Sequence, residues 1–376
     1  MQSELLDLPC PAPGTRRSLK VVRFGRPGAR PKAYLQAALH GDELPGVMAL
    51  AHLEELLAEA DAAGRIRGEI VLVPVANPIG LSQSVMGVHA GRYDLASMSN
   101  FNRGWPDFLE RVAHEAGPRL GLDAAANVAL VRAALGEAAR SMPAAGENAA
   151  LRRLLYGLAH DADIVLDLHC DLEAVTHLYL GSPLWPDARD LAADIGSEAT
   201  LLAEVSGGNP FDEAFSGLWW SLQRRFPDKN LPLACLAATV EYRGLLDVSE
   251  RQGRQDASNL LRFLTRRGLV AGEVPPPASC PEARPLEGVA MVRAPVAGLV
   301  SFEAAPGQEV EEGALLAVLV DPLAGEPARR RTEVRAPAGG TLFARAACRL
   351  ARPGDILAKV AGTRPLPGRT GALLSD

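Results

Sequence analysis

The stretch AYLQAALHGDELPG, residues 33–46, decides how the rest of the chain is arranged. Its apolar run at residues 34–39 predicts a buried strand, and apolar residues at helical spacing after residue 46 predict a helix. Between these two elements lie His40 and Glu43, whose imidazole and carboxylate groups are common zinc ligands. A loop that leaves a strand can direct both side chains toward one point. Two ligands alone do not define a metal site.

A second apolar segment, ADIVLDLHCD at residues 162–171, supplies a third candidate ligand. It predicts another buried strand, which ends at His169. His40, Glu43 and His169 form a His2Glu set, which leaves a fourth zinc position open and is typical of catalytic zinc sites. We expect the two strands to lie side by side, so that the three residues bind one Zn²⁺ per chain. The alternative is structural: a helix-capping His40, a solvated Glu43 in the first helical turn, and a core His169.

Length and charge bound the class of protein. A chain of 376 residues is long for a single core and predicts two domains, and 48% hydrophobic with 22% charged residues is ordinary for a globular protein. The 39 basic and 45 acidic residues give a net charge of -6, without a basic block that would neutralise phosphates or anionic lipid. We therefore expect neither nucleic acid nor membrane as a partner.

The cysteines and the first residues indicate the compartment. The five cysteines are scattered and odd in number, without a Cys-x-x-Cys pair, which argues against a disulfide framework. The start, MQSELLDLPCPAPG, lacks the basic-then-apolar order of a secretory signal, and no run approaches roughly 18 consecutive apolar residues. We expect a cytoplasmic protein.

The order of elements predicts an α/β domain over residues 1–270. Apolar strands are expected at residues 19–24, 69–76 and 233–242 besides the two described above, with helical segments between them. This alternation predicts a mixed, mostly parallel sheet flanked by helices. Trp219 and Trp220 fall on a predicted helix, where a core or interface role is expected; an interface there would serve a homo-oligomer. Residues 271–288, AGEVPPPASCPEARPLEG, are a proline-rich linker that ends the domain.

Residues 289–376 contain an internal repeat. VRAPVAGLVSFEAAPGQEVEEGALLAVL from Val292 is echoed 42 residues later (334 − 292) by VRAPAGGTLFARAACRLARPGDILAKV from Val334. Short alternating strands and Pro-Gly turns predict an all-β domain, a small barrel or sandwich. The segment resembles the biotinyl/lipoyl barrel-sandwich fold. It lacks the carrier lysine of those domains at the central hairpin, since the only lysine of the repeat is Lys359.

Further polar residues have the types that amide hydrolysis requires. Glu241 ends the strand in TVEYRG and is the leading candidate for a general base, with a structural salt bridge as the alternative. The long irregular segment 80–108 carries Asn102 and Arg103, which suit a substrate carboxylate, and Arg92, which can polarise a carbonyl. Loop-stabilising roles are the alternative for these three. Asp167 is either a partner that orients His169 or a member of an internal ion pair.

Five motifs in order carry a resemblance: HGDELPG, NP followed by GRYD, NFNRGWP, DLHCD and TVEYRG. Over roughly residues 30–270 the chain resembles the succinylglutamate desuccinylase/aspartoacylase family, whose catalytic domain is similar to the zinc carboxypeptidases. The resemblance implies zinc ligands at His40, Glu43 and His169. It also implies a general base at Glu241, substrate-carboxylate binding by Asn102 with Arg103, and oxyanion stabilisation by Arg92.

The chain departs from the aspartoacylases themselves after the histidine of DLHCDLEAVTHLY. DLHCD, EAVTHLY and the β appendage are closer to a bacterial branch that includes the ectoine-pathway N-acetyl-diaminobutyrate deacetylase. His177 and Tyr179 either shape a substrate pocket or are structural.

The function expected from these observations is zinc-dependent hydrolysis of the amide bond in a small N-acyl amino acid or related amide. Two alternatives remain from the sequence. One is a zinc carboxypeptidase that acts on short peptides, and the other is a non-catalytic binding or scaffold protein with the same fold.

Overall fold

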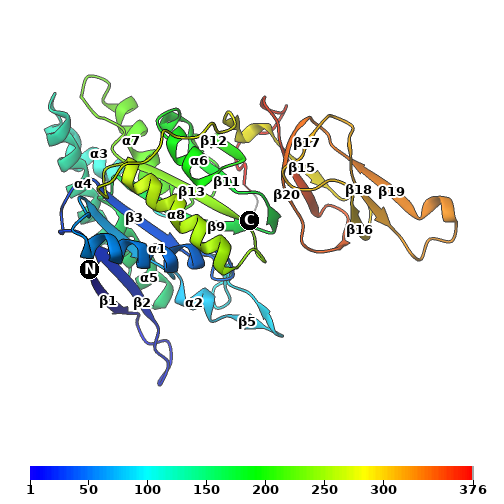
Figure 1. Ribbon diagram of the computed structural model, residues 1–376, viewed down its shortest axis with the longest axis horizontal. Helices are drawn as coiled ribbons and strands as arrows, with labels where there is room; N and C mark the ends of the chain where they lie inside the picture. Colours follow the sequence, from blue (N-terminus) through cyan, green and yellow to red (C-terminus); the bar gives the residue numbers. More distant parts are fainter. Residues whose placement is uncertain (375–376) are drawn as a thin grey trace.

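A nine-stranded sheet organises the first part of the chain in this computed structural model, which describes residues 1–374 (Figure 1). Its order is β1-β2-β4-β3-β9-β13-β11-β12-β14. The strands are β1 (Gln2–Asp7), β2 (Ser18–Phe24), β3 (Lys32–Ala37), β4 (Glu69–Val73), β9 (Ile164–Asp171), β11 (His177–Gly181), β12 (Ala199–Ala203), β13 (Leu236–Gly244) and β14 (Arg284–Pro285). The central strands β4, β3, β9 and β13 run parallel, which confirms the predicted mixed, mostly parallel sheet.

The central strands are buried over almost their whole length, as expected for strands covered on both faces. Every residue of β3 and β4 is buried, and so are the first seven of the eight residues of β9. The edge of the sheet was not predicted, because β1 is largely exposed and lacks a continuous apolar run. β1 pairs antiparallel with β2 along six residues from Gln2 to Asp7.

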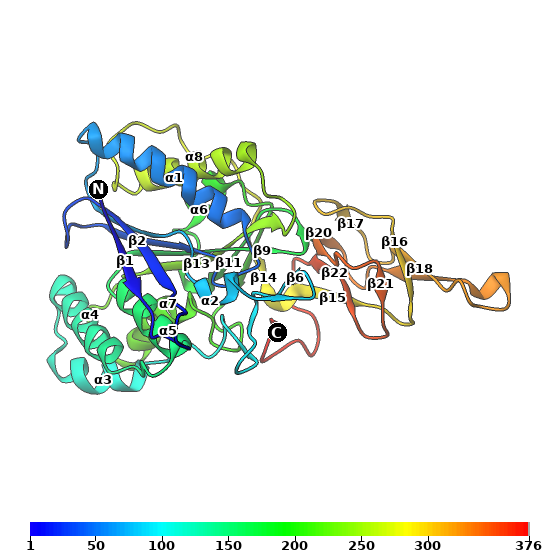
Figure 2. The same ribbon diagram turned by 90° about the horizontal axis from the view of Figure 1, so that it is seen from below.

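Helices cover both faces of the sheet (Figure 2). α1 (Pro45–Ala62), α6 (Arg189–Ile195) and α8 (Glu250–Arg266) lie on one face, and α3 (Leu109–Ala116), α4 (Ala124–Arg140), α5 (Glu147–Ala159) and α7 (Glu213–Arg225) lie on the other. Alternate residues of each strand point into one or the other of the two resulting cores: in β3, Tyr34 joins one and Leu35 the other.

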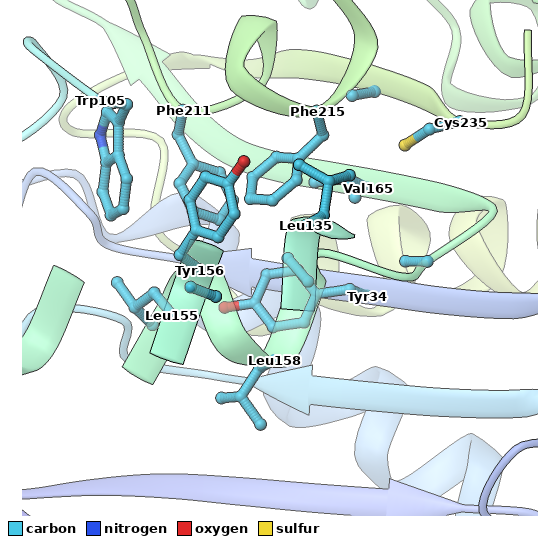
Figure 3. Packing of buried hydrophobic residues seen from close by; sticks show 14 of the residues in the cluster. Tyr34, Trp105, Leu135, Leu155, Tyr156, Leu158, Val165, Phe211, Phe215 and Cys235 are labelled. Atoms are coloured by element: carbon cyan, nitrogen blue, oxygen red, sulfur yellow. The ribbon is translucent and has the colours of Figure 1, made fainter. Parts of the chain in front are cut away.

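The core under α5 and α7 is rich in aromatic side chains (Figure 3). Phe211 contacts Trp105 edge-on at 4.7 Å between ring centroids, and Tyr156 lies 4.7 Å from Phe215. Trp219 and Trp220 are buried within the chain, at 2% and 4% exposure. The predicted core role of these tryptophans is confirmed, and a homo-oligomer formed through this helix stays a prediction.

The irregular segment after β4 is ordered by short elements. It contains α2 (Pro78–Leu81) and two strand pairs, β5 (Ser84–Val85) with β6 (Val88–His89) and β7 (Tyr93–Asp94) with β8 (Ser99–Asn100). Gln83 stabilises it by donating from Nε2 to the carbonyl oxygens of Ala90 and Tyr93. Arg92 and Asn100 are thereby carried to the end of the central sheet.

The C-terminal residues form two antiparallel sheets around an apolar core of their own. One sheet contains β10 (Glu173–Ala174), β20 (Gly340–Arg345), β22 (Ile356–Ala361), β15 (Val289–Arg293) and β17 (Glu309–Val310), and the other β19 (Arg331–Arg335), β18 (Leu315–Val320), β16 (Gly298–Phe302) and β21 (Leu350–Ala351). This agrees with the predicted all-β character of the repeat. The likeness to the biotinyl/lipoyl fold stays a prediction.

The two parts of the chain are joined by strand pairing. β10 belongs by sequence to the α/β part, but it pairs with β20 at Glu173–Arg345 and Ala174–Ala344. Within the predicted linker 271–288, β14 extends the large sheet by pairing with β12. The division into domains at residues 1–270, 271–288 and 289–376 remains a proposal. Among the described residues, no helix has the length and apolarity that crossing a membrane requires.

Candidate metal centre and catalytic site

The loop between β3 and α1 places two of the three candidate ligands. β3 ends at Ala37, and Ala38 adopts φ 54°, a left-handed conformation that costs a non-glycine residue on the order of 1 kcal/mol. The chain turns there, so that His40 and Glu43 precede the helix that begins at Pro45. β9 lies next to β3 in parallel register and carries His169 near its carboxyl end.

The three predicted ligands converge. His40, Glu43 and His169 are 3%, 4% and 2% exposed, and one possible ligand atom from each lies within 4.8 Å of the others. The Glu43 carboxylate lies between the imidazoles, with Oε1 2.9 Å from His40 Nδ1 and Oε2 2.6 Å from His169 Nδ1. The ring centroids of the two histidines are 4.9 Å apart. The facing Nδ1 atoms and the shared carboxylate fit a His2Glu ion site.

The outer nitrogen of each imidazole is also engaged. His40 Nε2 lies 2.9 Å from Asn100 Oδ1, and His169 Nε2 lies 2.9 Å from Asp167 Oδ2. These oxygens accept the Nε2 protons, which leaves the Nδ1 lone pairs for an ion. Asp167 in turn accepts a 2.9 Å hydrogen bond from Gln36 Nε2, and Gln36 Oε1 accepts from Tyr34 Oη at 2.7 Å.

The charges of the cluster depend on one another. Burial opposes ionisation of Glu43, but the two adjacent imidazoles outweigh it and hold the pKa of this carboxyl well below its ordinary value. Burial lowers the pKa of His40, and Glu43 offsets this only in part. For His169, the carboxylates of Asp167 and Glu43 overcome burial and raise the pKa well above its ordinary value. The Glu43 carboxylate is therefore ionised between the two imidazoles.

Glu241 lies beside this cluster on the next strand. β13 runs parallel to β9, and Glu241 is the register partner of His169, so both residues reach the same edge of the sheet. Burial and, second to it, the negative charge of Glu43 raise the pKa of Glu241 to about 8. Its Oε2 atom is buried without a hydrogen-bond partner among the described residues. The carboxyl group is therefore placed to exchange a proton within the cavity.

The predicted polar residues of the long loop reach the same place. Arg92 Nη1 lies 3.2 Å from Glu43 Oε1 and 3.3 Å from His40 Nδ1. Both ends of the Asn102 amide face protein groups: Oδ1 accepts from the Phe211 backbone N–H at 2.8 Å, and Nδ2 lies 3.3 Å from His169 Nε2. Asn102 thus anchors its loop as well as lining the site, whereas its role in binding a substrate carboxylate stays a prediction.

One cavity collects all seven residues predicted for the site. It has a volume of about 110 Å³, and the predicted residues that line it are His40, Glu43, Arg92, Asn102, Arg103, His169 and Glu241. His177 and Tyr179, for which the sequence left the role open, differ in position. Tyr179 lines the cavity, whereas the His177 ring is buried against the Phe343 ring, with 5.0 Å between the centroids.

The C-terminal part closes one wall of this cavity. Leu286, Met291, Lys359 and Leu374 all line it. Lys359 Nζ pairs with the Asp171 carboxylate, which follows two residues after His169. In the sequence, Lys359 is notable only as the single lysine of the repeat. No periodic pattern relates it to the cavity residues around Asp171, which lie far earlier in the chain.

Other residues of the cavity were not predicted. Asp212 and Glu213 line it at the start of α7, and Asn100 lies next to His40. Asn100 belongs to the quoted motif NFNRGWP and was available as a candidate. For Asp212 and Glu213, the only sequence signal is that the apolar pattern is interrupted before the predicted helix. This interruption predicts a loop, but it does not predict where the side chains of the loop point.

The family follows from a comparison of the sequence with known families. The model of the succinylglutamate desuccinylase/aspartoacylase catalytic domain matches residues 29–222, a segment that contains the three candidate ligands. The chain belongs to this family. The resemblance stated from the motifs is thereby confirmed at the level of the family.

Solved structures extend the similarity to the whole chain. A family member from Shewanella amazonensis is 28% identical with a TM-score of 0.86, over 96% of this chain and 98% of that one. A second protein of the family, from Shewanella frigidimarina, is 26% identical with a TM-score of 0.84, over 96% and 97%. The product-bound ectoine utilization protein EutE (DoeB) from Ruegeria pomeroyi, at 19% identity and a TM-score of 0.68 over 96% and 95%, shares the fold. No curated protein matches the sequence.

Proposed function

We propose that this protein is a zinc-dependent amidohydrolase that cleaves a small N-acyl amino acid or related amide into a carboxylate and a free amine. The convergence of His40, Glu43 and His169 beside Glu241 is the observation that carries this proposal. Membership of the desuccinylase/aspartoacylase family supports it. The two imidazoles and one carboxylate are ligands that zinc accepts, with one Zn²⁺ per chain.

The chemistry divides among four groups. A zinc ion held by the three ligands supplies Lewis acidity that activates water and polarises the scissile carbonyl. Glu241 accepts the proton of the attacking water and later delivers it to the leaving nitrogen. Arg92, 3.2 Å from Glu43, provides positive charge for the oxygen that becomes negative in the transition state. Arg103 supplies a guanidinium group for a carboxylate of the substrate.

The enclosed cavity favours a small amide over a peptide. A carboxypeptidase needs an open groove for the residues before the scissile bond, whereas here Met291, Lys359 and Leu374 of the C-terminal part line the cavity. These residues leave a volume of about 110 Å³, which suits a small molecule. Placement near the ectoine-pathway deacetylase rests on the motifs DLHCD and EAVTHLY and stays a proposal.

Turnover of two substrate panels tests the proposed function. We expect N-acyl amino acids to be hydrolysed and peptides with free carboxyl ends to be untouched after the protein is loaded with zinc. Peptide trimming without acyl amino acid turnover would instead establish the carboxypeptidase. No turnover of either panel, together with less than about 0.2 zinc per chain after loading, would favour a non-catalytic scaffold.

A further inference from the structure

Apolar and aromatic side chains line part of the cavity and take no part in the chemistry proposed above. They belong to a single core cluster, which packs the α/β part of the chain against the C-terminal part. The members of this cluster that also line the cavity are called the apolar wall below: Tyr179, Leu201, Ala203, Leu286, Met291 and Leu374. They come from β11, β12 and β15, from the segment that joins the two parts, and from the end of the described residues, so both parts build the wall.

Leu374 is held in place although it lies near the end of the chain. The backbone N–H groups of Leu373 and Leu374 both donate to the Ser206 carbonyl oxygen, at 2.7 and 3.3 Å. The Leu373 side chain is 3% exposed and packs in the same cluster. The close approach requires glycine at position 207, where φ is 96° and a Cβ would lie 2.6 Å from Ala372 Cα. Leu374 is therefore a fixed part of the wall.

The apolar wall differs in chemistry from the rest of the cavity. The candidate metal ligands, Arg92 and Glu241 form the polar part of the lining, whereas no residue of the wall carries a charge. A charged group placed against the wall would lose hydration and gain no ion pair from it, and the Tyr179 hydroxyl is the only strong hydrogen-bonding side-chain group that the wall contains. An aliphatic group placed there leaves water at no such cost.

We propose that the apolar wall binds an uncharged aliphatic group of the substrate, and that Leu374 limits the length of this group. The inference rests on the proposed function and names the substrate class: an N-acyl amino acid with an aliphatic chain in its acyl half or in its amino acid half. The carboxylate of such a molecule remains available to Arg103, so one substrate contacts both the polar and the apolar part of the cavity. The volume of about 110 Å³ favours a short chain.

The apolar wall also disfavours substrates whose acyl group or side chain is anionic. A succinyl group and an aspartate side chain both end in a carboxylate, which would meet only uncharged residues at the wall. A butyryl group and the side chain of 2-aminobutyrate have the same numbers of carbon atoms without the charge. We therefore expect the uncharged member of each of these pairs to be preferred.

Two series of substrates test the proposal and locate the aliphatic group. One varies the acyl half on glycine from acetyl through propionyl and butyryl to pentanoyl. The other varies the amino acid half of an N-acetyl amino acid from alanine through 2-aminobutyrate and norvaline to norleucine. In at least one series we expect kcat/KM to rise about fourfold for each added methylene until the cavity is filled, as for burial of a CH2 group. In that series, N-succinylglycine or N-acetylaspartate should be at least about tenfold poorer than N-butyrylglycine or N-acetyl-2-aminobutyrate.

Variants of Leu374 distinguish a residue that limits the chain from one that only supports the fold. Leu374→Ala enlarges the cavity and should lengthen the best chain by one or two carbon atoms, whereas Leu374→Phe should shorten it. A purely structural role would lower kcat/KM for every chain length alike. The control is Leu323→Ala, at a leucine of the C-terminal part that is 90% exposed, and it should keep the wild-type optimum.

Direct binding covers the case in which the Leu374 variants fail to fold. In calorimetry with the full-length wild-type protein, butyrate should bind at least about tenfold more tightly than acetate, or norvaline at least about tenfold more tightly than alanine, according to the series that rises. Equal binding within that pair, flat kcat/KM in both series, a preference for the charged substrates, or an unmoved optimum in folded Leu374 variants would overturn the inference while leaving the proposed function intact. Absence of all deacylation would instead refute the proposed function.

Discussion

Glu241 and His169 are register partners on the parallel strands β13 and β9, although 72 residues of sequence (241 − 169) separate them. This pairing brings a buried carboxyl group to the edge of the sheet where the two imidazoles and Glu43 meet. The proposed division of labour follows from it: one strand provides a metal ligand, and its neighbour provides the group that transfers protons.

Replacement of Glu241 by Gln tests this division. The amide has nearly the same shape but accepts no proton, so we expect at least about a 10²-fold loss of kcat with zinc content unchanged. Steady-state kinetics and metal analysis of the same preparation check both parts. Glu110→Gln, an exposed glutamate on α3, serves as the matched control. Activity within a few-fold of wild type in Glu241→Gln would place the base elsewhere.

His169→Ala separates the metal-ligand role of His169 from a structural one. Loss of one of three ligands should remove both zinc and activity, because two ligands hold the ion far more weakly. The control is His114→Ala, an exposed histidine on α3, which should keep both. Full zinc content in a folded His169→Ala protein would exclude His169 as a ligand.

Asp167 is expected to act through His169. Its Oδ2 lies 2.9 Å from His169 Nε2 and its other oxygen is held by Gln36, so it fixes the orientation of the ring. We expect Asp167→Asn to weaken zinc affinity about 10- to 100-fold, measured by competition with a chelator. A zinc affinity equal to that of wild type would show that Asp167 forms hydrogen bonds in the core without affecting zinc binding.

The histidine at the junction with the C-terminal part predicts a pH dependence of stability. His177 is fully buried, its Nδ1–H donates to the Val175 carbonyl oxygen at 2.8 Å, and its Nε2 has no partner among the described residues. Burial lowers the pKa of His177 to about 4. As the pH falls, His177 is protonated in the unfolded chain before it is protonated in the folded protein. The free energy of unfolding is therefore unaffected above about pH 6.5 and declines as the pH falls toward 4.

Between pH 7 and pH 5 this decline amounts to about 2 kcal/mol from His177. Urea unfolding at several pH values measures it, and His177→Gln should remove this part of the slope. The exposed-site variant His114→Gln should retain it. An identical slope in wild type and His177→Gln would show that the histidine is neutral in both states or charged in both.

The sequence predicted the centre of the molecule better than its periphery. The strands before His40, His169 and Glu241 were recognisable because each is a continuous apolar run, and parallel order alone brings their ends together. The sheet and the convergence of His40, His169 and Glu241 follow from this, whereas Arg92, Asn102 and Arg103 reach the cavity from the long loop. The edge strand β1 escaped because its residues are mostly exposed and alternate poorly.

A different reason explains why three residues at or near the site were not predicted from the sequence. Lys359 and Asp212 reach the cavity through the packing of a C-terminal strand and a helix start, and Asn100 reaches His40 from a loop. None of these three arrangements leaves a periodic signal in the sequence. Their contacts depend on how separate segments meet in space. Sequence motifs indicate the proposed chemistry of the site, whereas the residues of its walls are recognised only in the folded structure.

An anomalous-scattering measurement at the zinc absorption edge, on crystals grown with zinc, tests the central claim most directly. We predict one strong peak per chain, bordered by His40 Nδ1, the Glu43 carboxylate and His169 Nδ1. A crystal of the folded protein without a peak at that position, or with zinc bound only elsewhere, would contradict the account.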